Sequence, residues 1–437
     1  MMQSGFGWFA IVRMGLVQAS LGAIVMLATS LLNRLMVVEF GLAAGIPAGL
    51  VAWHYAVQLS RPMWGQGSDK GRQRTPWILA GMALLALGAL AAVNATILLG
   101  SSTAWGIALA VIAFTMIGAG VGAAGTSLLA LLASGVAPER RPAAAALTWI
   151  MMVAGIVVAA ATAGALLDPF TPTRLAMVAS GVVATALLVT TLAVWKLEAR
   201  ALPATAAERS AEVPDVRAAL AEIYAEPAAR RFTAFIFVSM LAYSMQDLIL
   251  EPFAGLVFGM TPGESTSLSG MQHGGVLIGM IVAGVGGSAF AGRLPGELRN
   301  WIAVGCVGSA LALAGLVFGA AAGIGWPLEA NVFALGFANG LFAVAAIGSM
   351  MGLAGAGEKT REGVRMGVWG AAQAIAFGLG GLIGALGVDA ARALIGADAQ
   401  AFQLIFALEG ALFIVAAALA LRNTKRNAIE VGRMARA

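Results

Sequence analysis

MQDLILEPFAGLVFGM, the stretch from Met245 to Met260, overlaps an apolar run that extends from Phe232 to Phe258. A run of that length can cross a bilayer as a single helix. Asp247 and Glu251 are four residues apart in it, so their carboxyl groups lie on one helical face. Each ionised carboxylate at bilayer depth costs at least ~2.5 kcal/mol. The stretch therefore predicts a functional site inside a membrane protein, with Gln246 as a third polar member.

The composition extends this interpretation to the whole chain. Hydrophobic residues make up 60% of the 437 residues and charged residues 11%, and the mean hydropathy is +0.89. A soluble protein of this size would have too few polar residues to cover its surface. The basic residues are spread over loops, so the net charge of +5 is not interpreted as a nucleic-acid surface.

Apolar runs separated by helix breakers predict twelve membrane spans. Their approximate bounds are 15–38, 43–61, 76–99, 103–133, 143–167, 174–195, 232–258, 267–291, 300–323, 328–356, 364–388 and 400–421. Placing both termini in the cytoplasm puts nearly all of the 26 basic residues on the inner side. Before the first span, the expected interfacial anchors are Phe6, Trp8, Phe9 and Ile11.

A long polar segment divides these spans into six and six. We therefore expect an N-terminal half at 1–195, a cytoplasmic linker at 196–231, a C-terminal half at 232–421 and a basic cytoplasmic tail at 422–437. Apolar residues recur at helical spacing within 215–226, which predicts an amphipathic linker helix on the membrane surface. Two halves of six helices with both termini inside are typical of the major facilitator fold.

The loop after the second predicted span supports the same fold. It contains Gly65, Asp69, Gly71, Arg72 and Arg74, and it resembles the facilitator-family loop G-x-x-x-D-x-x-G-R-x-R. Glycines permit a tight turn there, the arginines suit a cytosolic interface, and the aspartate can cap a helix or bind an arginine. This loop indicates a fold and carries no information about a substrate.

Paired glycines recur within the predicted spans. Helices associate in lipid through small residues that let their backbones approach, so these pairs predict close packing, with contact to a flat ligand as the alternative. The pairs are Gly118 with Gly122, Gly275 with Gly279 and Gly380 with Gly384.

Several stretches together resemble the PucC-type family. MQDLILEPFAGLVFGM is similar to that family's Q-D-x-L-L-E-P-[FY]-G-G-x-V-F-G-M, and residues 31–39, LLNRLMVVE, are similar to its L-N-R-V-M-I-V-E. Residues 58–62, QLSRP, and 74–78, RTPWI, also fit. The loop between the second and third spans is most similar to a subgroup named for a bacteriochlorophyll synthase chain. Residues 39–47, EFGLAAGIP, are longer than the family's usual E-L-G-V-P, so the loop after the first span is expected to differ.

The resemblance implies a multi-pass protein of a bacterial inner, photosynthetic intracytoplasmic membrane. It implies a role in bacteriochlorophyll delivery and in the assembly of light-harvesting complexes. The implied partners are bacteriochlorophyll or its precursor, a pigment synthase, and antenna polypeptides or a reaction-centre complex. The implied cofactors are bacteriochlorophyll or a carotenoid, bound without a covalent link.

Arg34 lies near the outer end of the first span, with Glu39 five residues later. Spans one and seven occupy equivalent positions in the two halves of a facilitator fold, so we expect Arg34 to converge with Asp247 and Glu251. The group is interpreted either as a structural ion pair or as a site for a ligand or a proton. Pro252 cannot donate a backbone hydrogen bond and predicts a kink in span seven.

His54 and His273 are the only two histidines, in the second and eighth predicted spans. A neutral imidazole can donate a lone pair to the magnesium of a chlorin, so both residues are candidate pigment ligands. The alternative for each is a hydrogen bond between helices.

The sequence shows no phosphate-binding loop, metal-ligand cluster or nucleophile–histidine arrangement, so we expect a non-catalytic protein without a metal site. The leading hypothesis is an accessory protein that binds bacteriochlorophyll and hands it to a synthase or antenna polypeptide. The principal alternative is a proton-coupled secondary transporter that uses Asp247 and Glu251. A third hypothesis is a scaffold that organises antenna proteins without touching pigment.

Overall fold

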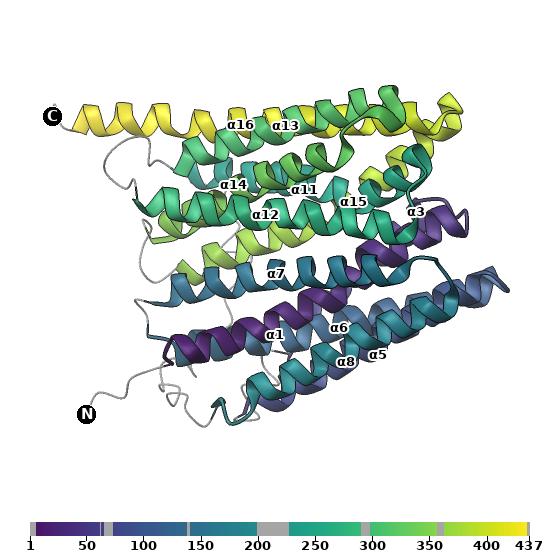
Figure 1. The fold of residues 1–437 in the computed structure, drawn as a ribbon. Coiled ribbons are helices and arrows are strands. Elements are labelled where there is room, and N and C mark those ends of the chain that lie inside the picture. Colours follow the sequence, from purple (N-terminus) through teal and green to yellow (C-terminus); the bar gives the residue numbers. More distant parts are fainter. Residues whose placement is uncertain are drawn as a thin grey trace. The chain divides into compact units, whose positions relative to one another are not determined.

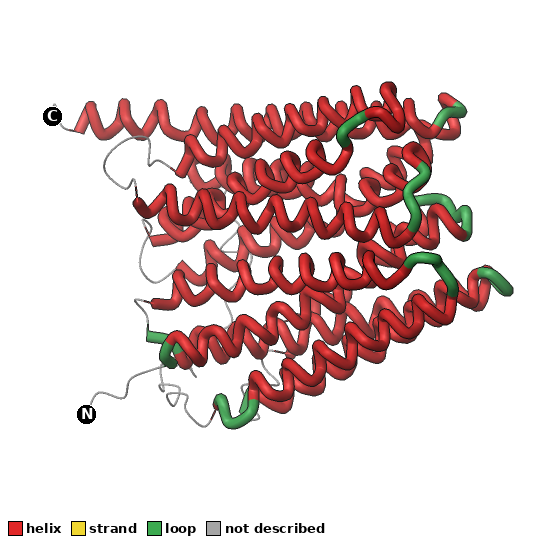
Figure 2. Tube along the Cα trace, viewed as in Figure 1, coloured by secondary structure: helices red, strands yellow, loops and turns green. Residues whose placement is uncertain are grey.

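The computed structural model describes residues 6–61, 63–64, 73–137, 140–198, 227–289, 298–355 and 362–434. The regular structure within these ranges is entirely helical (Figure 1, Figure 2). Eleven of the described helices are long and apolar enough to cross a membrane. This confirms the expected all-α membrane protein.

The second predicted span is the exception among the twelve. Its counterpart is α3 (Gly45–Val57), followed by the 3₁₀ turn η3 (Gln58–Ser60). Thirteen α-helical residues are fewer than the ~20 that cross a hydrocarbon core. The count of twelve spans therefore stays a prediction. The cytoplasmic position of both termini depends on that count and also stays a prediction.

Contacts between residues divide the chain into two units. One comprises Met1–Ala211 and Leu250–His273, and the other comprises Glu212–Ile249 and Gly274–Ala437. The helices α11 (Pro227–Phe258) and α12 (Pro262–Ala289) thus each contribute to both units. The predicted division around 196–231 stays a prediction, because the amphipathic segment at 215–226 lies outside the described residues.

Three helices of the first unit begin with a proline start signal. Its full helices besides α3 are α1 (Trp8–Met26), α5 (Thr75–Leu99), α6 (Thr103–Gly135), α7 (Arg141–Leu167) and α8 (Pro172–Val194). α5, α7 and α8 each carry a proline at the first or second position, where no intrahelical N–H bond is lost. The most extensive contacts join α5 to α6 and α1 to α7.

The start of the chain corrects one expectation. Phe6 is not an interfacial anchor: it is 2% exposed, and its backbone N–H donates to the Gly135 carbonyl at 2.7 Å. Ile11 is also buried, in a cluster with Leu128 and Leu131 of α6. Helix α1 begins at Trp8, earlier than predicted, so its apolar face packs inside the unit instead of lying along the membrane surface.

The second unit contains α13 (Leu298–Ala322), α14 (Leu328–Gly355), α15 (Glu362–Ile395) and α16 (Asp398–Met434), together with most of α11 and the second half of α12. α13 has its largest contacts with α14 and α16. α16 continues past the predicted end of the last span through most of the predicted basic tail.

The three glycine pairs lie where backbones approach closely. A Cβ added at Gly275 or Gly279 would meet the Phe333 or Phe337 carbonyl of α14. Gly380 and Gly384 of α15 similarly face the carbonyls of Leu241 and Met245 on α11. Gly118 lies against the His54 carbonyl, and Gly122 against the Trp64 ring. These contacts support helix packing over contact with a flat ligand.

We predict that Gly279→Ala lowers the free energy of unfolding by about 1 to 3 kcal/mol, because the added methyl group overpacks the α12–α14 contact. Gly284→Ala is the matched control, since among the described residues no atom lies within 4 Å of a Cβ at Gly284. That control should be neutral or stabilising by up to ~1 kcal/mol through helix propensity. Thermal unfolding in detergent measures both, and equal effects would contradict the packing role.

Candidate functional site

The end of the first membrane span departs twice from α-helical geometry. After α1 come a π-helical turn η1 (Leu27–Leu31), a short α2 (Leu32–Arg34) and a second π-helical turn η2 (Leu35–Glu39). π-Helical turns are rare, and they occur frequently at functional sites. No pattern in the sequence predicted these turns.

The second π-helical turn explains the ion pair between Arg34 and Glu39. Residues five apart in an α-helix point about 140° away from each other. In η2 the Phe40 N–H donates to the Leu35 carbonyl, five residues back, and this wider turn brings positions 34 and 39 together. Arg34 Nη1 lies 2.5 Å from Glu39 Oε1.

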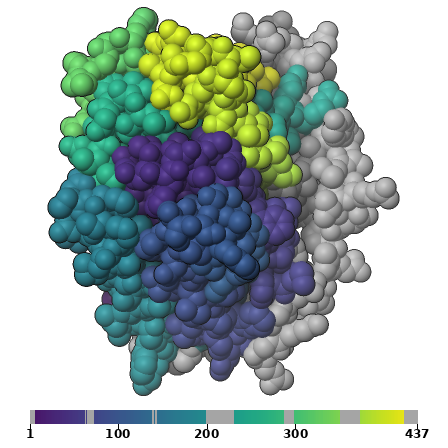
Figure 3. All heavy atoms as spheres, turned by 90° about the vertical axis from the view of Figure 1, so that its right-hand side faces the viewer, coloured from purple at the N-terminus to yellow at the C-terminus, as the bar shows by residue number. Residues whose placement is uncertain are grey.

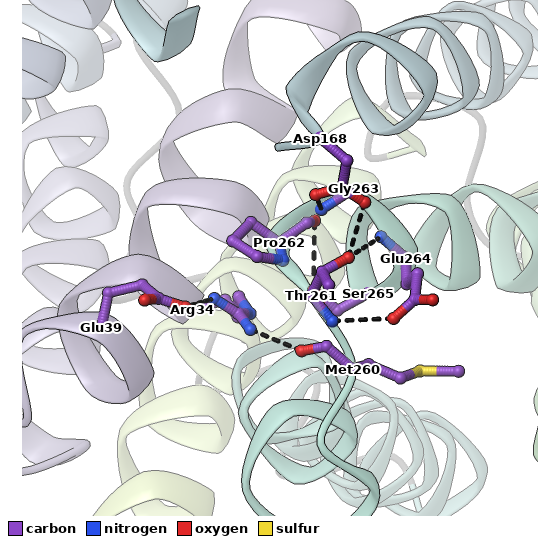
Figure 4. A network of polar contacts seen from close by, with 9 residues as sticks. All are labelled: Arg34, Glu39, Asp168, Met260, Thr261, Pro262, Gly263, Glu264 and Ser265. Atoms are coloured by element: carbon purple, nitrogen blue, oxygen red, sulfur yellow. Dashed lines mark hydrogen bonds and ion pairs between the residues drawn. The ribbon is translucent and has the colours of Figure 1, made fainter. Parts of the chain in front are cut away.

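Arg34 also binds the end of α11. Its Nη2 donates to the Met260 carbonyl at 2.7 Å, and Figure 4 shows the guanidinium between Glu39 and Met260. The same nitrogen lies 3.2 Å from the position of a Cβ at Gly255, so a larger residue there would crowd it. The two stretches that resemble the PucC-type family, residues 31–39 and 245–260, therefore meet at this arginine.

Glu251 lies one helical turn before Gly255 and is 2% exposed. The hydroxyl groups of Ser269 and Ser30 and the charge of Arg34 act on its carboxyl group. Among the described residues, neither carboxylate oxygen of Glu251 has a partner with acceptable hydrogen-bond geometry. The charge of Arg34 is already balanced by Glu39. Glu251 is therefore a buried carboxyl group whose two oxygens can still accept hydrogen bonds.

Asp247 and Gln246 belong to the second unit, although they are on the same helix as Glu251. Gln246 is fully buried, and neither its amide nitrogen nor its amide oxygen has a partner among the described residues. Glu409 of α16 is also fully buried and interacts electrostatically with Asp247. The sequence marked Glu409 as a costly buried acid, but only the fold relates it to Asp247. Helix α11 continues through Pro252 to Phe258, and the predicted kink stays a prediction.

The turn between α11 and α12 is held by a compact polar network (Figure 4). Thr261 and Glu264 form a capping box, in which Glu264 accepts from the Thr261 N–H at 2.8 Å and Thr261 Oγ1 accepts from the Glu264 N–H at 3.2 Å. Asp168, which follows α7, accepts from Thr261 Oγ1 at 2.6 Å and from the Gly263 N–H at 3.2 Å. The carboxylate of Asp168 thus stabilises the N-terminus of α12.

The loop after the first span packs within the first unit. It spans 40–44, with Gly41 at a positive φ of 64°. The Phe40 ring lies 3.2 Å from the position of a Cβ at Gly100, in the turn between α5 and α6. In Figure 3 this purple segment lies against the blue α5–α6 turn.

The two histidines differ in their hydrogen bonds. His54 is 1% exposed, and its Nδ1 and Nε2 contact the Val51 carbonyl at 2.9 Å and Gln58 Nε2 at 2.8 Å. Half-buried His273 has one such contact among the described residues, from Nδ1 to the Ser269 carbonyl at 2.9 Å.

Of the loop motif predicted to be cytoplasmic, only Arg74 is described; Gly65, Asp69, Gly71 and Arg72 lie outside the described residues. The Arg74 guanidinium donates to the Ala130 carbonyl and to Ser134 Oγ near the end of α6. The Glu198 carboxylate accepts from the backbone N–H groups of Arg74 and Thr75 at the start of α5, at 2.6 and 2.9 Å. Arg74, at the described end of the motif, therefore contacts α6 and Glu198.

The helical architecture and the buried polar groups define a multi-pass membrane protein with the major facilitator fold. A crystal structure of the peptide transporter POT in complex with sulfate matches with a TM-score of 0.69, covering 97% of this chain and 96% of that one. The sequence identity is 13%, so this likeness shows the fold alone.

The chain belongs to the family described as PUCC protein, which matches residues 31–428. It is 53% identical over 418 residues to the "Bacteriochlorophyll synthase 44.5 kDa chain" of Rhodobacter capsulatus, covering 95% of each chain. It is 30% identical to "Protein PucC" of the same organism, covering 95% of this chain and 92% of that one.

We predict that Arg34 and Glu39 are coupled by about 1 to 3 kcal/mol in a double-mutant cycle of Arg34→Gln and Glu39→Gln, because Arg34 is almost completely buried. The control cycle uses Arg392 and Asp398, whose side chains are 33% and 39% exposed in their own ion pair. Its coupling should stay below about 1 kcal/mol. Thermal unfolding of the purified variants measures both, and equal couplings would contradict a special role for the buried pair.

Proposed function

We propose that this chain is an integral membrane accessory protein for bacteriochlorophyll delivery and for the assembly of light-harvesting complexes. The observation that carries the proposal is the match over 95% of the chain to a relative named for bacteriochlorophyll synthesis. A second relative in the same family is named PucC, and it too matches along almost its whole length.

The buried site supports a binding role over a catalytic one. Its polar groups are the Arg34–Glu39 ion pair, the buried Glu251 carboxyl group and two serine hydroxyls, from the first span, α11 and α12. These groups can bind a polar substituent or exchange a proton, but they include no activated nucleophile. The proposed role is therefore non-catalytic, and the reaction belongs to a partner synthase.

The proposed ligand is bacteriochlorophyll or its precursor, with a carotenoid as a second pigment to test. The proposed recipients are a pigment synthase, antenna polypeptides or a reaction-centre complex. The proposed location is the inner, intracytoplasmic membrane of a photosynthetic bacterium, where these partners share the bilayer with this chain.

We predict that Glu251→Gln lowers the accumulation of pigment–protein complexes several-fold while the protein still inserts. Glutamine keeps the side-chain volume but removes the charge and the exchangeable proton of the buried carboxyl group. Membrane absorption spectra, normalised to the amount of the protein, measure the effect. Leu250→Met is the control, because Leu250 is equally buried on the same helix and this change conserves volume. Equal losses in both variants would show that this part of α11 matters only for packing.

Proton-coupled secondary transport is the second candidate function. It is favoured by the buried carboxyl group of Glu251 and the half-buried one of Asp247 on α11, and by the fold shared with a peptide transporter. In this case Asp247→Asn should abolish substrate-driven proton flux in proteoliposomes, because the variant lacks an exchangeable proton at that position. Wild-type vesicles without flux for any pigment precursor or peptide tested would argue against transport. Normal pigment assembly in the Asp247→Asn strain would separate the two functions.

A further inference from the structure

From the hydrogen bonds of the two histidines, we infer that His273, and not His54, provides an imidazole ligand for the central magnesium of a bacteriochlorophyll-type pigment. This inference rests on the proposed pigment-binding function and specifies one residue for it.

Both ring nitrogens of His54 already have hydrogen-bond partners. A backbone carbonyl can only accept, so the contact with Val51 requires the proton on Nδ1. Nε2 is then the acceptor, and the Gln58 amide donates to it at 2.8 Å. The Gln58 side chain is held in turn by Arg61, which donates to its oxygen. Binding a metal at His54 Nε2 would therefore require breaking its buried hydrogen bond with Gln58.

His273 has the arrangement of a metal ligand. Its Nδ1 contacts the Ser269 carbonyl at 2.9 Å, so the proton must lie on Nδ1 and the lone pair on Nε2. Metal-binding histidines almost always donate their other N–H to a carboxylate, a carbonyl or water in this way. No hydrogen bond to Nε2 is found within the described ranges.

The depth of His273 makes its free lone pair significant. It lies about 17 Å along the helix from Pro262, at a rise of 1.5 Å per residue. The span Pro262–Gly286 crosses a hydrocarbon core of about 30 Å, so His273 is near its middle. Water is scarce at that depth, and a polar atom there needs a partner.

The residues that follow His273 at helical spacing on α12 are apolar. One and two turns after His273, Leu277 is half-buried and Ile281 is 46% exposed. A chlorin bound through its magnesium would cover these apolar side chains and give Nε2 the partner that the described residues do not supply. Binding a chlorin through its magnesium would thus give Nε2 a partner and bury the apolar side chains.

The test measures pigment affinity of the full-length purified protein in detergent. The probes are bacteriochlorophyll and its magnesium-free form, which has the same ring and tail but no metal. The wild type should bind the magnesium form at least about tenfold more tightly. His273→Leu should remove that preference, whereas His54→Leu should keep it. Resonance Raman bands that report magnesium coordination should change only in the His273 variant.

A second variant distinguishes loss of the magnesium ligand from loss of folding. In His273→Ala, added imidazole should restore the preference for the magnesium form, which a misfolded protein would not show. Wild-type binding of both pigments with equal affinity, unchanged in His273→Leu, would overturn the inference but leave pigment binding intact. Failure of the wild type to bind either pigment would instead contradict the proposed function itself. The two failures are therefore distinguishable.

Discussion

The buried guanidinium of Arg34 is the constraint on which the rest of the site depends. Moving such a charge out of water costs several kcal/mol unless a counter-charge and hydrogen-bond acceptors surround it. Glu39 supplies the counter-charge and the Met260 carbonyl supplies an acceptor. The π-helical turn, the small residue at Gly255 and the end of α11 must all be in place for these contacts to form together. Arg34 thus links the π-helical turn of the first span to the end of α11.

Charge balance then explains why Glu251 is a functional candidate. The pair of Arg34 and Glu39 is neutral on its own, so the positive charge near Glu251 is already compensated. Neither oxygen of this buried carboxyl group has a hydrogen-bond partner of good geometry among the described residues, and at this depth that favours a bound proton or ligand. Asp247 and Glu409 form a second acidic group, located in the second unit. Ordinary helix packing does not require such groups, and the glycine contacts show that this chain packs its helices by other means.

The two histidines differ in whether their second ring nitrogen has a hydrogen-bond partner among the described residues. Both lie in apolar segments, and both donate Nδ1–H to a carbonyl of their own helix. The difference is a glutamine four residues after His54, which occupies the second nitrogen. At the position four residues after His273 the chain has a leucine, which cannot form a hydrogen bond. A single neighbouring side chain therefore decides whether an imidazole is structural or available as a ligand.

The sequence by itself determined the class of protein, because hydropathy over some twenty residues is a local property that a bilayer converts directly into helices. It also marked Arg34, Glu39 and Glu251 as candidate site residues, because charged residues within apolar runs are conspicuous. It could not predict the burial of Phe6, because a single aromatic residue suits a membrane surface and a protein core equally well. It also could not predict the π-helical turns, the contact of Arg34 with Met260, or the role of Asp168 at the start of α12. The contact of Arg34 with Met260 joins residues 226 positions apart. The π-helical turns have a wider repeat than an α-helix, and no local sequence pattern predicts that repeat. Only the tertiary structure decides them, because the energy of each contact depends on which distant groups share its low-dielectric surroundings.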